Sequence, residues 1–80
     1  MLDTKRSIRT IARDIRGDWK NVNYAAVPYL NAMEYLIGVN DTYGHDSARD
    51  IVTRFLVNAV HWRGENARRI KAELRELMAK

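Results

Sequence analysis

The segment from Asn40 to Glu65 reads NDTYGHDSARDIVTRFLVNAVHWRGE and contains both histidines and one of the two tryptophans of the chain. Turn-forming residues dominate its first part, up to Asp46. Ser47 follows, and Asp50 three residues later completes a variant of the capping box, with aspartate in place of the usual glutamate. The sequence therefore predicts a helix that begins near Ser47 and runs to about Val60.

This helix is the most apolar element of the chain and is expected to be the centre of packing. Its expected buried residues are Ile51, Val52, Phe55, Leu56, Ala59 and Val60. The sequence Trp62-Arg63-Gly64 then bends or interrupts the helix, because glycine is a weak helix former.

A last helix is expected from Arg63 or Glu65 to Met78. The spacings Glu65–Arg69 and Arg69–Glu73 place opposite charges four residues apart and predict modest support for this helix. The residues expected to face the core are Ala67, Ile70, Leu74, Leu77 and Met78.

Two further helices precede the central segment. The first is expected from about Thr4 to Trp19, because apolar residues recur there at helical spacing within an arc of roughly 100°. These residues are Ile8, Ile11, Ala12, Ile15 and Trp19. The second is expected to start near Tyr24 or Pro28, with Asn23 as its N-cap, and to stop at Gly38. Its expected buried residues are Ala26, Val27, Leu30, Met33 and Ile37, and its tyrosines, Tyr24, Tyr29 and Tyr35, are expected at the edge of the core or at an interface.

The fold class predicted from these patterns is all-α: one domain over residues 1–80, built as a small bundle of about four helices. Eighty residues allow one thin core, and the chain shows no repeat, strand alternation or low-complexity segment. A thin core and a surplus of tyrosine and tryptophan over what 80 residues bury predict an oligomer.

Composition excludes several kinds of protein. The chain has no cysteine, so it has neither disulfides nor a thiolate metal site. It contains no run of about 18 apolar residues and no signal-peptide core after Met1, so we expect a soluble cytoplasmic protein. His45 and His61 lack metal-ligand spacing, and no nucleophile motif is present. The sequence predicts no catalytic residue, metal or cofactor, and therefore no enzyme.

The charge is unevenly distributed around its net value of +4. Residues 1–20 carry six lysines and arginines against three aspartates, residues 21–48 carry three acids and no base, and residues 49–80 carry eight bases against four acids. On the first helix Arg9, Arg13 and Arg16 lie on one arc, which is either a solvated face or a face toward phosphates or an acidic partner.

The strongest candidate for binding is the segment from Trp62 to Lys71. A tryptophan at a bend can stack on a planar group while guanidinium groups hold anionic oxygens. The candidate residues here are Trp62, Arg63, Arg68, Arg69 and Lys71, and Tyr43 on the preceding turn is a further candidate. Alternatively, Trp62 closes the end of the core and the arginines pair with nearby acids.

One local similarity is explained better by turn chemistry. Residues 40–45, followed by Asp50, resemble the NDxYGHxxGD segment of the GGDEF domains of diguanylate cyclases. Arg49 stands where that family has glycine, and its upstream metal pair would fall on Ala32 and Glu34. No GG[DE]EF sequence follows, and 80 residues are too few for that α/β domain.

The last two helices, with Gly64 between them, also allow a helix-turn-helix, and hence a small DNA-binding transcriptional regulator as an alternative function. Arg63, Arg68, Arg69, Lys71 and Arg75 would then meet phosphates. The interleaved Glu65, Glu73 and Glu76 would repel the DNA backbone and weaken this alternative.

The chain resembles a group of small bacteriophage and prophage proteins. The resemblance rests on IARDIRGDWKNVNYAAVPYLNAM and DTYGHDSARDIVTRFLVNAVHWRGENARRIKAEL, and covers residues 11–74. It implies a phage accessory protein acting in the cytoplasm of a bacterial host, and carries over no site residues. Such proteins commonly bind a host protein complex or an anionic nucleotide ligand, so we expect an inhibitor of host defence, such as an anti-CRISPR protein or a nucleotide sponge.

The two groups of arginines provide a way to distinguish these partners. If Arg9, Arg13 and Arg16 converge with Arg63, Arg68 and Arg69 on a pocket that contains an aromatic ring, a small anionic nucleotide is favoured. If the arginines spread over an open face, a protein or a nucleic acid is favoured.

Overall fold

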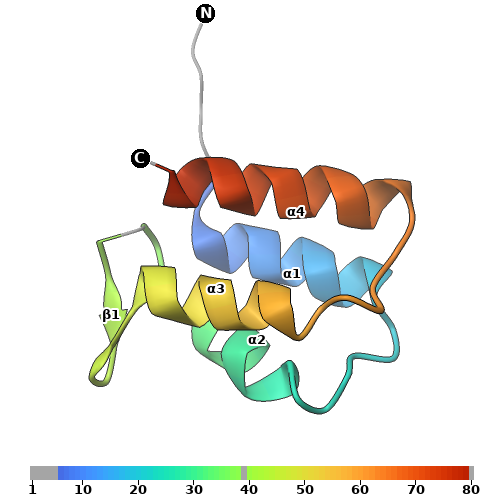
Figure 1. Cartoon of the computed structure of the whole chain (residues 1–80). Helices are drawn as coiled ribbons and strands as arrows, with labels where there is room; N and C mark the ends of the chain where they lie inside the picture. Colours follow the sequence, from blue (N-terminus) through green and yellow to red (C-terminus); the bar gives the residue numbers. More distant parts are fainter. Residues whose placement is uncertain (1–5, 39, 80) are drawn as a thin grey trace, which may run out of the picture.

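The computed structural model describes residues 6–38 and 40–79, which form four helices and one short hairpin. In chain order the elements are α1 (Ile8–Asp18), α2 (Val27–Met33), β1 (Thr42–Tyr43), β2 (Asp46–Ser47), α3 (Ala48–Val57) and α4 (Glu65–Met78). α4 packs mainly against α1 and runs opposite to α1 and α3 (Figure 1). The prediction of a small bundle of four helices is confirmed.

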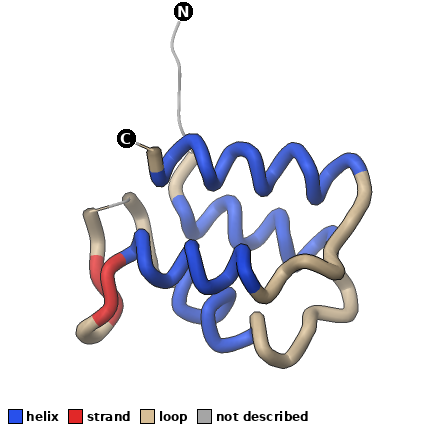
Figure 2. The backbone as a smooth tube through the Cα atoms, in the orientation of Figure 1, coloured by secondary structure: helices blue, strands red, loops and turns tan. Residues whose placement is uncertain are grey.

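The hairpin was not predicted, so the all-α class is incomplete. β1 and β2 are antiparallel and pair Thr42 with Ser47 and Tyr43 with Asp46. The two short strands are drawn in red in Figure 2. Gly44 has a φ of 66° in the two-residue turn, a conformation that glycine adopts without strain. Strands of two residues are too short to produce an alternating pattern, so the sequence suggested only a turn.

α1 begins later than predicted. Thr4 lies outside the described residues, but Ser7 is extended, and its hydroxyl accepts a hydrogen bond from the Thr10 amide at 3.2 Å. Ser7 is therefore the N-cap, and Ile8 is the first helical residue. All five apolar residues predicted for this helix are buried, and the helix continues through Gly17 to Asp18.

α2 is shorter than predicted and ends at Met33 rather than near Gly38. The chain leaves the helix because the carbonyls of Ile37 and Leu36 accept hydrogen bonds from the amides of Ile8 and Arg9, both at 2.9 Å. This pairing buries Leu36 and leaves Ile37 52% exposed, which reverses the burial predicted for Ile37.

The start of α2 also differs from the prediction. Ala26 is the N-cap, and Pro28 lies in the first turn as expected. Asn23 does not cap the helix: its side-chain amide donates to the carbonyl of Asn58 at 3.3 Å and its oxygen accepts from Ala25. Tyr24 is fully on the surface rather than at the core edge.

α3 begins as predicted, with the Ser47 hydroxyl accepting from the Asp50 amide at 3.1 Å. It ends at Val57, three residues before the predicted end, and Asn58 caps it. Val60 is therefore 58% exposed rather than buried, and Leu56 is half-buried. The other predicted residues, Ile51, Val52, Phe55 and Ala59, are buried.

α4 begins at Glu65, one of the two predicted starts, and ends at Met78. Gly64 precedes it with a φ of 114°, so a residue with a side chain would be strained there. Ala67, Ile70 and Leu74 are buried, whereas Leu77 and Met78 are half-buried. The predicted pairs Glu65–Arg69 and Arg69–Glu73 do not form: Arg69 contacts Asn66, and Glu73 pairs with Arg6.

The core is organised around three aromatic rings. Trp19 and Trp62 are stacked, with ring centroids 5.7 Å apart and an interplanar angle of 9°. Phe55 meets both rings edge-on, at 6.2 Å from Trp19 and 6.4 Å from Trp62. The cluster joins α1, α3 and the bend before α4. No helix of the described chain is long and apolar enough to cross a membrane.

Candidate binding surface on helix α4

Trp62, the residue expected to stack on a ligand, belongs to the core. Its side chain is 2% exposed, and Trp19 covers one face of its ring. Its indole N–H donates to the Asp18 carboxylate at 2.8 Å, and its carbonyl accepts from the Lys71 ammonium at 2.7 Å. Trp62 therefore lies at the end of the core, and its ring is not exposed for stacking on a ligand in this structure.

Asp18 connects the end of α1 to the start of α4. Besides the bond from Trp62, its second carboxylate oxygen accepts from the Asn66 amide at 3.0 Å. The hydrogen bonds from Asn66 and Trp62 lower the pKa of the Asp18 carboxyl, and the positive charges of Arg69 and Lys20 act in the same direction. Through these contacts Asp18 contributes to the packing of the end of α1 against the start of α4.

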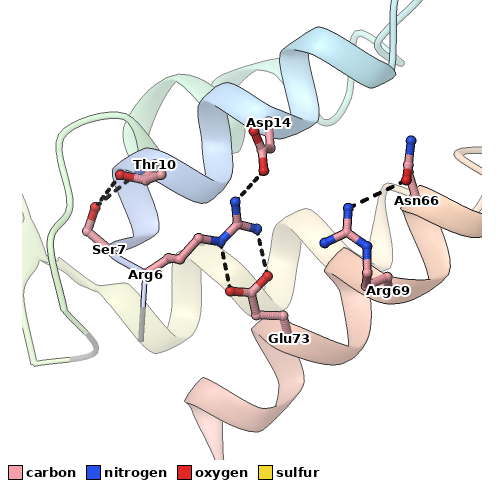
Figure 3. A network of polar contacts seen from close by, with 7 residues as sticks. All are labelled: Arg6, Ser7, Thr10, Asp14, Asn66, Arg69 and Glu73. Carbon is pink, nitrogen blue, oxygen red and sulfur yellow. Dashed lines mark hydrogen bonds and ion pairs between the residues drawn. The ribbon is translucent and has the colours of Figure 1, made fainter. Parts of the chain in front are cut away.

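Arg6 makes a second connection on the α1 side of α4. Its guanidinium donates two hydrogen bonds to Glu73, at 3.0 and 2.7 Å, and also pairs with Asp14 (Figure 3). The forked contact raises the pKa of Arg6, with the Glu73 bonds as the largest cause. One guanidinium thus pairs with two carboxylates from different helices.

The basic residues of α4 separate onto two sides of the helix. Arg69 lies on the α1 side with Arg13, in an open depression of about 310 Å³ that is also lined by Asp14 and Asp18. Arg69 donates to the Asn66 side chain at 3.5 Å. Cations and carboxylates are mixed here, so this depression has little preference for an anion.

On the other side of α4 is a depression whose charged lining residues are all cations. An open depression of about 290 Å³ is lined by Trp62, Arg63, Gly64, Ala67, Arg68, Lys71 and Arg75, with no carboxylate among them. Burial lowers the pKa of the Lys71 ammonium, and the charges of Arg75 and Arg63 lower it further. We name Arg63, Arg68, Lys71 and Arg75 the basic cluster.

The basic cluster is not neutralised within the described part of the chain. The ion pairs among residues 6–38 and 40–79 join Arg6 to Asp14 and Glu73, and Arg16 to Glu34. None includes a member of the cluster. Lys71 is held by the Trp62 carbonyl and lies 5.7 Å from the centre of its ring, whereas Arg63, Arg68 and Arg75 are exposed to solvent.

The other predicted site residues lie elsewhere. Arg16 joins α1 to α2 by pairing with Glu34 and Asn31, and Arg9 and Arg13 are exposed on α1. Tyr43 stacks on Tyr35, with ring centroids 5.6 Å apart, and the hairpin that carries it lies at the end of the molecule opposite the start of α4 (Figure 1). Only Arg13 and Arg69, one from each group, line a common depression, and the two groups as wholes do not converge on one pocket.

Arg75 belongs to the cluster although the sequence indicated it only for the DNA-binding alternative. Its signal was its position four residues after Lys71 and seven after Arg68, which places the three side chains on one face of a helix. The same periodicity places Arg69 about 100° away from Arg68.

An apolar groove continues from the basic cluster between α3 and α4. It has a volume of about 530 Å³ and is lined by Thr53, Leu56, Val57, Arg75, Met78 and Ala79. Arg75 lines both hollows, so the cluster and the apolar groove form one continuous strip.

No protein-family model, curated protein or solved structure matches the chain. Among the described residues, no group of three or more histidine, aspartate or glutamate side chains is arranged to hold a metal ion. The distinctive feature of the surface is therefore the strip along α4.

Proposed function

We propose that this chain is a non-enzymatic binding protein that docks the basic cluster onto an acidic surface of a partner protein. The observation that supports the proposal is the set of four cations around one open depression without a carboxylate. Like charges held together reduce the stability of a fold, so such a cluster is costly unless an anionic partner neutralises it. Complementary charge also speeds encounter with that partner.

A small nucleotide is a poorer candidate for the partner. Proteins commonly bind a nucleobase by stacking it on an accessible aromatic ring, and the ring beside the basic cluster, Trp62, is buried. The exposed Tyr35 and Tyr43 stack on each other away from the cluster. The depression is open, whereas small ligands are mostly enclosed by their sites.

DNA remains the alternative partner, because phosphates also attract unpaired arginines. The apolar groove next to the cluster offers nothing to a nucleic acid backbone, whereas a protein surface can present apolar side chains to it together with acidic ones. Glu65 and Glu76 are exposed on α4 and would repel acidic side chains as well as phosphates, so they do not distinguish the two partners.

The resemblance to phage proteins suggests where this binding takes place. In that setting we propose that the partner is a host defence complex in the bacterial cytoplasm, inhibited when the basic cluster covers one of its acidic surfaces. Whether the protein acts as an oligomer stays a prediction, and Tyr35, Ile37 and Tyr43 are exposed apolar residues at which copies could meet.

The test is capture of host proteins from a bacterial lysate by the tagged protein, with the R63E/R68E/R75E variant compared against R9E/R13E. We expect the wild type and R9E/R13E to retain the same acidic protein after nuclease treatment, and the cluster variant to lose it. The control variant reverses two exposed charges on α1 and leaves the basic cluster intact. Capture that survives in the cluster variant would contradict the proposal, and capture abolished by nuclease would favour DNA.

A further inference from the structure

The α3-facing side of α4 is one strip with two chemistries. Gly64, Lys71, Arg75 and Met78 follow each other along it at helical spacing. Its first half is the basic cluster, and its second half is the apolar groove. At 1.5 Å per residue, the strip from Gly64 to Ala79 is about 22 Å long, or about four helical turns.

The apolar groove is open to solvent in the isolated chain. Val57 is 67% exposed and lines the groove with the half-buried Leu56 and Met78. A volume of about 530 Å³ lies within the range of clefts that bind ligands. Because apolar surface gains about 25 cal/mol for each Å² removed from water, a partner with apolar side chains would bind here in preference to a purely charged one.

The walls of the apolar groove determine the backbone of its occupant. Both walls are helices, α3 and α4, and a helix has no row of unpaired backbone groups like that of a strand at a sheet edge. The groove therefore offers side chains and no free sheet edge. An occupant must satisfy its own backbone, and an amphipathic helix does so while presenting apolar residues on one face.

We propose that the strip on α4 binds an acidic amphipathic helix of a partner protein. Apolar residues at positions i, i+3 or i+4, and i+7 enter the apolar groove, and carboxylates beside them meet Arg75, Arg68 and Arg63. This inference rests on the proposed function and adds the shape and polarity of the partner segment.

A second copy of the chain is not the occupant favoured by charge. Among the four helices, α1, α3 and α4 each contain more lysines and arginines than acids, and α2 contains neither. None of them offers an acidic face, so a copy would bring like charge to the basic cluster. The occupant is therefore a different protein.

The test uses two synthetic 15-residue peptides of identical composition, made of leucine, alanine, glutamate and glutamine. In the first, the leucines form one helical face flanked by glutamates; in the second, the same residues are shuffled so that the leucines surround the helix. Titration calorimetry measures the binding of each peptide to the full chain. We expect the amphipathic peptide to bind at least about 10-fold more tightly, which corresponds to about 1.4 kcal/mol.

Two matched variants locate the contact. Val57→Gln changes an exposed residue in the apolar groove, and Val60→Gln makes the same change at an exposed residue that does not line it. We expect V57Q to remove the preference for the amphipathic peptide and V60Q to retain it. Circular dichroism checks that both variants fold, which is expected because neither residue is buried.

Several outcomes would overturn the inference, and they differ from failure of the proposed function. Equal binding of the two peptides, lost in R63E/R68E/R75E, would retain a basic docking surface and overturn the helix in the groove. If neither peptide binds, the inference of a helix in the groove is overturned. The proposed function is then tested separately by the capture of an acidic host protein from lysate. Tighter binding of a 15-base-pair DNA duplex would overturn both. A dimer in sedimentation that V57Q abolishes would assign the groove to a second copy.

Discussion

The two sides of α4 use charge in opposite ways. On the α1 side, Arg6 pairs with Asp14 and Glu73, and the Asp18 carboxylate accepts hydrogen bonds from Trp62 and Asn66. On the α3 side, the basic cluster lies beside an apolar groove with no carboxylate in either lining. Ion pairs and hydrogen bonds thus connect α4 to the rest of the fold on its α1 side, whereas the cations on its α3 side are not paired with a carboxylate of the described chain.

This difference separates structural from functional residues without a known ligand. A charge that already has a partner contributes to folding, and its loss is measured as lower stability. A charge without a partner contributes little to folding or opposes it, so its loss is measured as lower binding. Substitutions on the two sides should therefore affect different measurements.

The largest expected loss of stability is that of Trp62→Ala, on the α1 side of α4. Truncation removes a buried ring that stacks on Trp19 and leaves a cavity, at a cost of about 3–5 kcal/mol. A domain of this size has a total stability of only about 4–12 kcal/mol, so urea denaturation should show a much lower midpoint. Trp62→Phe keeps an aromatic ring and should lower the stability less. A W62A midpoint equal to that of the wild type would contradict the expected difference between the two sides of α4.

A smaller effect on the same side is expected from Asp18→Asn. The pKa of Asp18 is lower in the folded protein than in the unfolded one, so its ionised form stabilises the fold above the unfolded pKa of about 3.9. That stability is lost as the pH falls through the folded pKa. We expect D18N to be less stable than the wild type at pH 7, and the gap between them to narrow below pH 4. A gap independent of pH would show that the charge does not contribute.

Arg6→Ala should have the next smaller effect on stability. The Arg6–Glu73 contact is forked but about a third exposed, so solvent screening keeps its contribution below about 1 kcal/mol. Arg6→Lys keeps the charge and loses the fork, which separates geometry from charge. Thermal unfolding at low and high salt measures both variants. If R6A were as stable as the wild type at low salt, the Arg6 ion pairs would not contribute to the stability of the fold.

The smallest effect on stability is expected on the α3 side of α4, which carries the basic cluster. Replacing Arg68 and Arg75 by glutamine relieves like-charge repulsion and breaks no ion pair, so stability should change by less than about 0.5 kcal/mol or rise slightly. Chemical denaturation with urea, which adds no salt, measures this change. A loss as large as that of W62A would mean that the cluster is structural, and would remove the basis of the comparison.

The parts of the fold that were predictable depend on neighbours in sequence. α1, α3 and α4 follow from apolar residues at helical spacing, and the Ser47 cap follows from Asp50 three residues away. The end of α2 was not predictable, because it depends on carbonyls of Leu36 and Ile37 bonding to amides at the start of α1. Contacts between residues so far apart leave no periodic signal.

The candidate site was partly predictable for the same reason. The segment from Trp62 to Lys71 was identified from its local mixture of tryptophan and arginines. Which arginines act together depends on which side of α4 faces α1, and the sequence does not contain that orientation. The apolar groove was missed because Val57 and Met78 meet only when α3 and α4 pack together.

The stacked Trp19 and Trp62 have a consequence for how this protein can be observed. Trp19 and Trp62 are the two tryptophans of the chain, and their rings are nearly parallel. Trp62 also lines the depression of the basic cluster. Two indoles with ring centroids 5.7 Å apart couple their strong electronic transitions, so the ultraviolet circular dichroism of the folded protein should contain a signal from the pair that is lost when Trp19 and Trp62 separate on unfolding. The molecule thus contains its own optical probe for folding.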